Sequence, residues 1–211
     1  RHLGTDHTEL YITPEDGMAA IHRLPTLYDE PFSDSSQIPT FLVSSLARQH
    51  VTVSLSGDAG DELFSGYNRY QFTASMWSKL SRIPRPLRQL SSGIITNISP
   101  ASWNRIVSVL QGVIPAFSRW ANVGDKLHKG AGVMASKSAA DLYHRMISCW
   151  KDPASVVIGG VELPTLITGN MPDLSALNAV ERMMVLDLLT YLPDDILCKV
   201  DRAAMGVSLE S

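Results

Sequence analysis

Apolar and polar residues alternate in two short stretches of the chain, residues 7–12 and residues 51–55, which is the period of a β-strand. Helical patterns follow them. One begins at Pro14 behind a threonine that can cap it and extends to about residue 24, a second begins at Pro39 and ends near residue 50, and a third follows the turn after residue 57. Strand, helices, strand, helix is the order of an α/β fold, so we predict a parallel sheet with flanking helices.

Beyond about residue 70, strand patterns nearly vanish and prolines separate helical segments. We therefore predict an α/β portion over residues 1–70 and a mainly helical portion over residues 71–211. Asn178 and Glu181 have the spacing of a capping box. Further on, an apolar stripe runs along residues 196–207, and Lys199 and Arg202 fall off that stripe, three residues apart, where both can point into one cleft.

Composition narrows the class of protein. The chain has 211 residues, of which 45% are hydrophobic and 18% charged, with a net charge of −3. These values indicate a globular protein and argue against nucleic-acid binding through phosphate neutralisation. The two cysteines lack metal-type spacing and no apolar stretch is long enough for a bilayer, so we expect a cytoplasmic protein without a membrane span. The basic residues between Lys79 and Arg88 are interpreted as a solvated helix face.

The turn after the second predicted strand holds both small and acidic residues. Ser56 and Gly57 come first, and Asp58, Asp61 and Glu62 follow within five positions. A strand, a small-residue turn and a helix make a phosphate site, because the first amides of a helix are free to bind an anion. Acids suit such a site if a divalent cation lies between them and the phosphates, and Mg²⁺ prefers oxygen ligands. The alternative is that the acids only cap the helix.

Three stretches resemble one known family. "LSGDAGDELFSGY" is similar to the signature of the asparagine synthetase family, "LPDDILCKVDRAAMGVSLES" resembles its downstream segment, and "YDEPFSDSSQIPT" resembles the loop that precedes the strand in bacterial members. The resemblance implies a synthetase domain similar to the ATP pyrophosphatase (adenine nucleotide alpha hydrolase-like) fold. Such a carbon–nitrogen ligase adenylates a carboxylate, typically that of aspartate, and amidates it with ammonia from glutamine, producing asparagine, AMP and pyrophosphate.

The resemblance also implies roles for the residues of the turn. Ser56 and Gly57 match positions that contact the nucleotide, ATP. Asp58 matches the acid tied to acyl-adenylate formation and to the ammonia step, and Asp61 matches a ligand of Mg²⁺. Two residues depart from the family pattern, since Ala59 and Ser65 stand where glycine is usual. Ala59 would matter if its position needs a positive φ angle.

In the downstream segment, Lys199 matches a lysine that stabilises charge on the phosphates, and Arg202 is a further candidate for nucleotide binding. Lys199 could instead pair with Asp195 one helical turn earlier. The acids of the upstream loop, Asp29, Glu30 and Asp34, could face the amino-acid substrate or lie in solvent.

The resemblance is partial. The family's pyrophosphate loop, of the form Ser-Gly-Gly-x-Asp-Ser, is not found in these residues, nor is the glutaminase domain with its catalytic cysteine. We therefore expect the chain to be a part of a synthetase domain that is inactive by itself, with small molecules as substrates. A homodimer of the full-length protein stays open. Two alternative functions also stay open. One is an amidotransferase that acts on a sugar carboxylate in polysaccharide biosynthesis, and the other is a non-catalytic interaction module.

Overall fold

The structure is a computed structural model that describes residues 2–111, 122–150, 153–169 and 172–211. It divides into two compact units, and each is described by itself. Unit 1 comprises residues 1–66 and 185–211, and unit 2 comprises residues 67–184. No helix in the described part of the chain is long and apolar enough to cross a membrane.

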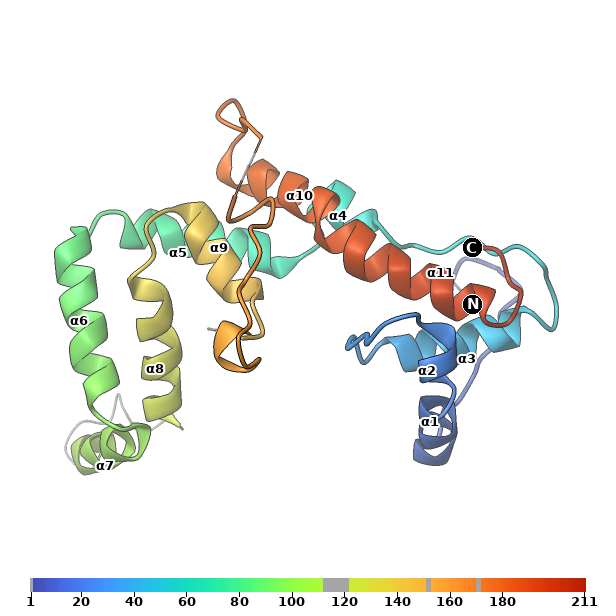
Figure 1. Ribbon diagram of the computed structural model, residues 1–211, viewed down its shortest axis with the longest axis horizontal. Coiled ribbons are helices and arrows are strands. Elements are labelled where there is room, and N and C mark those ends of the chain that lie inside the picture. The colour runs from blue at the N-terminus through green and yellow to red at the C-terminus, as the bar shows by residue number, and fades with distance from the viewer. Residues whose placement is uncertain (1, 112–121, 151–152, 170–171) are drawn as a thin grey trace. The chain divides into compact units, whose positions relative to one another are not determined.

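Unit 1 is built from short helices contributed by both ends of the chain (Figure 1). They are α1 (Pro14–Ile21), α2 (Leu24–Leu27), α3 (Gln37–Ala47), α4 (Gly60–Phe64), the π-helix η3 (Leu192–Leu197) and α11 (Cys198–Met205). The threonine cap is confirmed, because the hydroxyl of Thr13 accepts from the amide of Asp16 and the Asp16 carboxylate accepts from the amide of Thr13. The helix predicted to begin at Pro39 begins two residues earlier.

A small hydrophobic core joins the two ends of the chain in unit 1. Phe41 of α3, Ala20 of α1 and Ala203 of α11 are buried together. Leu27, Ile38, Leu42 and Val207 pack around them. Because this core brings α11 against α3, it places the predicted lysine-bearing helix next to the loop that precedes α3.

The predicted parallel sheet is wrong for this chain. Residues 7–12 form no strand, and the only β pairing among the described residues is one isolated parallel bridge between Val53 and Glu210. The amide of Ser54 donates to the carbonyl of Glu210 at 2.8 Å, and the amide of Glu210 donates to the carbonyl of Thr52 at 3.0 Å. A strand needs a ladder of hydrogen bonds from neighbouring strands. Residues 51–55 have the strand pattern without those neighbours, and Leu55 is 99% exposed.

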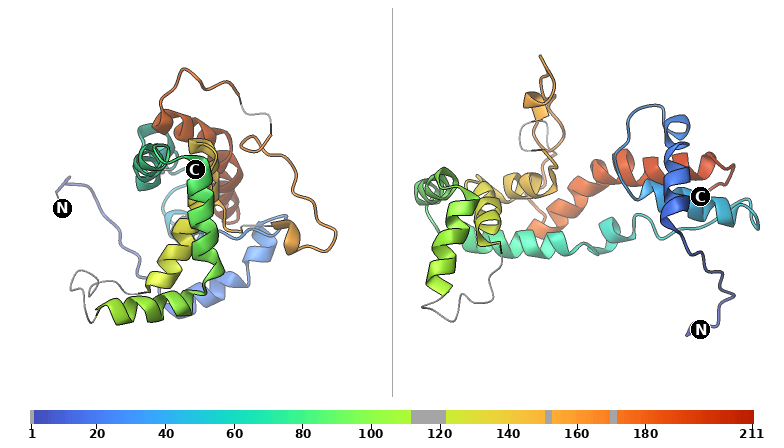
Figure 2. Two further views of the ribbon diagram at one scale, coloured as in Figure 1. Left: turned by 90° about the vertical axis from the view of Figure 1, so that its left-hand side faces the viewer. Right: turned by 90° about the horizontal axis from the view of Figure 1, so that it is seen from below.

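Unit 2 is helical (Figure 2). Its elements are α5 (Asn68–Leu80), α6 (Arg85–Asn97), α7 (Pro100–Gln111), α8 (Val123–Met134), α9 (Ala139–Ile147) and the 3₁₀-helix η2 (Pro153–Ser155), while α10 (Ala179–Leu189) has residues in both units. The predicted capping box of α10 is confirmed, because the side chain of Asn178 accepts from the amides of Val180 and Glu181, and the Glu181 carboxylate accepts from the amide of Asn178.

One basic residue of unit 2 departs from the prediction of a solvated face. Arg88 is 4% exposed, and its guanidinium donates to the carbonyls of Ile83, Met134 and Ser136 at 2.8–3.1 Å. The guanidinium thus satisfies backbone carbonyls from α8 and its C-terminal end, which explains why an arginine is buried here.

Candidate functional site

Lys199 is a buried cation. It lies in the first turn of α11, directly after the π-helix η3, and is 7% exposed because the apolar side of α11 packs on α3. π-Helical turns are rare and often occur at functional sites. A buried ammonium group must be paired to offset the free energy of removing it from water.

The partners of Lys199 come from the loop that precedes α3. Its Nζ donates to Oδ2 of Asp34 at 2.9 Å and to Oγ of Ser36 at 2.8 Å. Asp34 in turn accepts from the amide and from the hydroxyl of Ser36, both at 2.8 Å. Lysine, aspartate and serine thus form a closed triangle of charge-assisted hydrogen bonds, of the strong kind.

Residues 28–36, here called the acidic loop, contact α11 at two further points. Arg202 pairs with Asp29 at 2.7 Å, and the hydroxyl of Tyr28 donates to the carbonyl of Lys199 at 3.4 Å. The ring of Tyr28 stacks on that of Phe32, with centroids 4.8 Å apart. A cavity of about 550 Å³ borders this side of the loop. The acidic loop is therefore tied to α11 along its length and does not extend freely into solvent.

The surroundings of Lys199 shift the pKa values of the two nearby aspartates, Asp34 and Asp195, in opposite directions. Burial alone would raise the pKa of Asp34, but hydrogen bonds from Lys199 and Ser36 and the charge of Lys199 hold that pKa below its ordinary value. Burial and then repulsion from Asp34 raise the pKa of Asp195, which Lys199 only partly offsets. Oδ1 of Asp195 is buried without a hydrogen-bond partner. Burial, with the nearby Cys198 and both aspartates, raises the pKa of Tyr28 to about 12.

The turn at residues 56–62 leads into α4 without a side-chain cap. The N-cap residue of α4 is Ala59, with φ 69°, and no side chain caps the helix, so the alternative that the acids of the turn only cap the helix is wrong. Ser65, at the other end of α4, has φ 58°. Left-handed backbone is the conformation that glycine adopts at least cost. Both departures from the family's glycine pattern therefore fall at positions where the backbone requires a positive φ angle.

Asp61 lies against the backbone of Gly66. The amide of Gly66 donates to the carbonyl of Asp61 at 2.9 Å, and a Cβ on Gly66 would clash with the Asp61 carboxylate. A glycine at position 66 is thus needed for Asp61 to keep its side-chain position. Ser56, Gly57, Asp58 and Asp61 are all exposed.

All six predicted site residues belong to unit 1. Within the described part of the chain, the charged groups of Lys199 and Arg202 bind Asp34, Ser36 and Asp29, and the acids of the turn are not among these partners. The ion pair of Lys199 is thus with an aspartate 165 positions away, whereas helical spacing had suggested Asp195. Asp34 and Ser36 were missed as partners. The concentration of acids in the loop, opposite two cations on α11, was the signal available for finding them.

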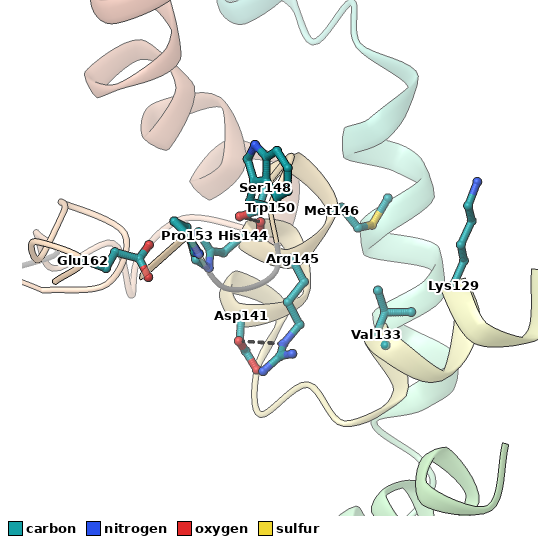
Figure 3. Close-up of a pocket in the computed structure, with 11 residues that line it drawn as sticks. Lys129, Val133, Asp141, His144, Arg145, Met146, Ser148, Trp150, Pro153 and Glu162 are labelled. Carbon is teal, nitrogen blue, oxygen red and sulfur yellow. Dashed lines mark hydrogen bonds and ion pairs between the residues drawn. The ribbon is translucent and has the colours of Figure 1, made fainter. Parts of the chain in front are cut away.

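Two further features of the described residues were candidates for a site, namely a metal-binding cluster and the hollow of unit 2. No group of three or more histidine, cysteine or acidic side chains suited to a metal occurs among the residues that the structure describes. Unit 2 has a hollow of about 540 Å³ beside α9, where Arg145 pairs with Asp141 at 3.1 Å (Figure 3). None of the six predicted site residues lines that hollow.

Comparison with known proteins gives the family. The family model described as "Asparagine synthase" matches residues 1–211, which is the whole chain. The chain belongs to the asparagine synthase family. The resemblance inferred from the three motifs is thus confirmed.

Relatives within the asparagine synthase family are longer than this chain. Asparagine synthetase [glutamine-hydrolyzing] 1 of Bacillus subtilis is 27% identical over 99% of the chain and 30% of its own length. A protein of Methanocaldococcus jannaschii with the provisional name asparagine synthetase [glutamine-hydrolyzing] 2 is 40% identical over 42% of the chain and 17% of its own length. The chain thus spans about 30% of the first of these relatives. No solved structure is significantly similar to it.

Proposed function

We propose that this chain is the part of a glutamine-dependent asparagine synthetase that supplies the carboxylate-activating residues of its synthetase domain. In the first step, a carboxylate oxygen of the acceptor, aspartate, attacks the α-phosphorus of ATP and pyrophosphate leaves. In the second step, the nitrogen of ammonia attacks the activated carbonyl carbon, AMP leaves, and an amide forms. Activation is needed because a carboxylate oxygen is a poor leaving group, whereas AMP is a good one.

The observation that supports this proposal most is the state of Lys199. This lysine is buried and paired with Asp34 of the acidic loop, which belongs to a second family motif, and its helix packs on α3. A lysine kept only for solubility would be exposed. The proposal assigns Lys199 to the negative charge that develops on the phosphates, with Arg202 as a second cation for the nucleotide.

The turn supplies the remaining roles of the proposal. The backbone at Ser56 and Gly57 contacts the nucleotide, and the Asp58 carboxylate assists acyl-adenylate formation and proton transfer from ammonia. Asp61 would hold Mg²⁺, because Mg²⁺ prefers oxygen ligands and is usually bound through one or two carboxylates together with substrate phosphates. When bound, Mg²⁺ neutralises charge on the phosphates.

The test is an assay of the protein at its full natural length for pyrophosphate release that depends on ATP, glutamine and aspartate. We expect release to depend on all three, and to fall to a small but measurable residual rate in K199M and D61N. Activity with a sugar carboxylate in place of aspartate would change the acceptor and keep the chemistry. The absence of turnover with both acceptors would instead favour a non-catalytic module and refute the proposal. The isolated chain is expected to release no pyrophosphate, because it spans only about 30% of its relative from Bacillus subtilis.

A further inference from the structure

We propose that Asp34 and Ser36 are positioning residues for Lys199, which fix its ammonium group where it meets the phosphates of the bound nucleotide. This inference rests on the proposed function, because it takes Lys199 as the phosphate-contacting lysine. It also gives the acidic loop a role. From the sequence alone, Asp34 of this loop could either contact the amino-acid substrate or lie in solvent.

The donor geometry of Lys199 supports a positioning role. An ammonium group has three hydrogens to donate. Two of them are taken by Asp34 at 2.9 Å and Ser36 at 2.8 Å, so their directions determine the direction of the third. A lysine side chain is otherwise a flexible stem with a freely rotating head. The two contacts thus leave one hydrogen for a further acceptor, in a defined direction.

The partners of Lys199 are themselves rigidly held. The carbonyl of Asp34 accepts from the amide of Gln37 at 3.1 Å, where α3 begins. Ser36 is the N-cap residue of α3, and its hydroxyl donates to Asp34 while it accepts from Lys199. Because α3 packs on α11 through the core of Phe41, the helix that carries the lysine is fixed against the helix whose first turn anchors Asp34 and Ser36. Anchoring at the start of a packed helix restricts the movement of the two loop residues that hold the lysine.

A purely structural ion pair is the alternative, and the two roles differ in what the loss of Asp34 should change. If Asp34 acts through Lys199, its loss affects turnover only while Lys199 is present. If Asp34 only stabilises the fold, its loss lowers the amount of active protein whether or not residue 199 is a lysine. A double-mutant cycle measures this difference directly.

The experiment uses the protein at its full natural length and compares D34N, K199M and the double variant by aspartate-dependent pyrophosphate release. A misplaced catalytic group can cost up to about 100-fold in rate, so we expect D34N to lower kcat by about 10- to 100-fold with little change in the KM for ATP. S36A should have a smaller effect, and D34E should recover part of the loss because it restores the carboxylate. K199M/D34N should have the same residual rate as K199M.

D141N is the matched control. Asp141 also pairs with a cation and accepts from a backbone amide, but it lies in unit 2, and the side chain of its partner Arg145 is 42% exposed, compared with 9% for that of Lys199. We expect the parent kcat in D141N, since surface pairs contribute little.

Two results would overturn the inference and leave the proposed function intact. One is an inactive K199M with D34N at the parent rate, and the other is a double variant much slower than K199M. An active K199M would instead refute the proposed role of the lysine itself.

Discussion

The two left-handed residues that flank α4 allow a quantitative prediction. Ala59 and Ser65 have φ angles of 69° and 58°, whereas glycine is usual at both positions in the family pattern. A residue with a Cβ in this conformation costs about 1–2 kcal/mol relative to right-handed backbone. Glycine avoids that cost but loses about 0.5–1 kcal/mol more conformational entropy on folding. For A59G we therefore expect the free energy of unfolding to rise by about 0.5–1 kcal/mol.

S65G should have the larger effect. The Ser65 hydroxyl oxygen is buried without a hydrogen-bond partner. A buried unsatisfied polar group costs about 1–3 kcal/mol, and glycine removes it together with the backbone strain. We expect a gain of about 1–2 kcal/mol for S65G, which allows for the cavity that the lost side chain leaves.

The assay is urea unfolding followed by circular dichroism, with A19G as the control. Ala19 is an exposed residue inside α1, where glycine costs about 0.5–1 kcal/mol. Local effects are followed by hydrogen exchange at the amides of Leu63 and Gly66, which donate to the carbonyls of Ala59 and Asp61. If A59G lowers stability as much as A19G, and its Leu63 amide exchanges faster than in the parent, the reasoning from the φ angles is refuted.

Three other substitutions test the geometry. G66A should displace the Asp61 carboxylate and weaken Mg²⁺ binding in a titration with ATP present, whereas G17A, where a Cβ has open space, should not. The pKa of Asp195 is higher in the folded than in the unfolded chain, where it is about 3.9, so protonated Asp195 stabilises the fold at low pH. This stabilisation is lost as the pH rises through the pKa of the folded state. D195N, which stays neutral, should therefore raise the urea midpoint at pH 7 but not at pH 3. R88L leaves three carbonyls without their donor and should cost about 2–3 kcal/mol of unfolding free energy, measured in urea, and an unchanged midpoint would contradict this.

Local patterns predicted local structure well. The Thr13 cap and the Asn178–Glu181 capping box both formed, because a cap involves residues three positions apart whose geometry the helix itself provides. The family was also readable from three short motifs, since motif residues and their order are properties of the chain alone. The positive φ angle of Ala59 was foreseen only as a condition, and the structure met it.

Non-local pairing was not predictable in the same way. The alternation of residues 51–55 is typical of a strand, yet a sheet forms only where other strands supply hydrogen bonds, and among the described residues only Glu210 does so. Arg88 was assigned to a solvated face by its spacing, but its acceptors include carbonyls of Met134 and Ser136, which no local pattern connects to it.

The sequence by itself determined the family, the helix caps and the identity of the candidate residues, because these depend on residue type and short spacing. Only the tertiary structure decided that Lys199 is buried against Asp34 and Ser36 and that Arg202 meets Asp29. The physical reason is that the free energy of such a pair depends on burial and on groups 165 positions apart, which only the packing of α11 on α3 brings together.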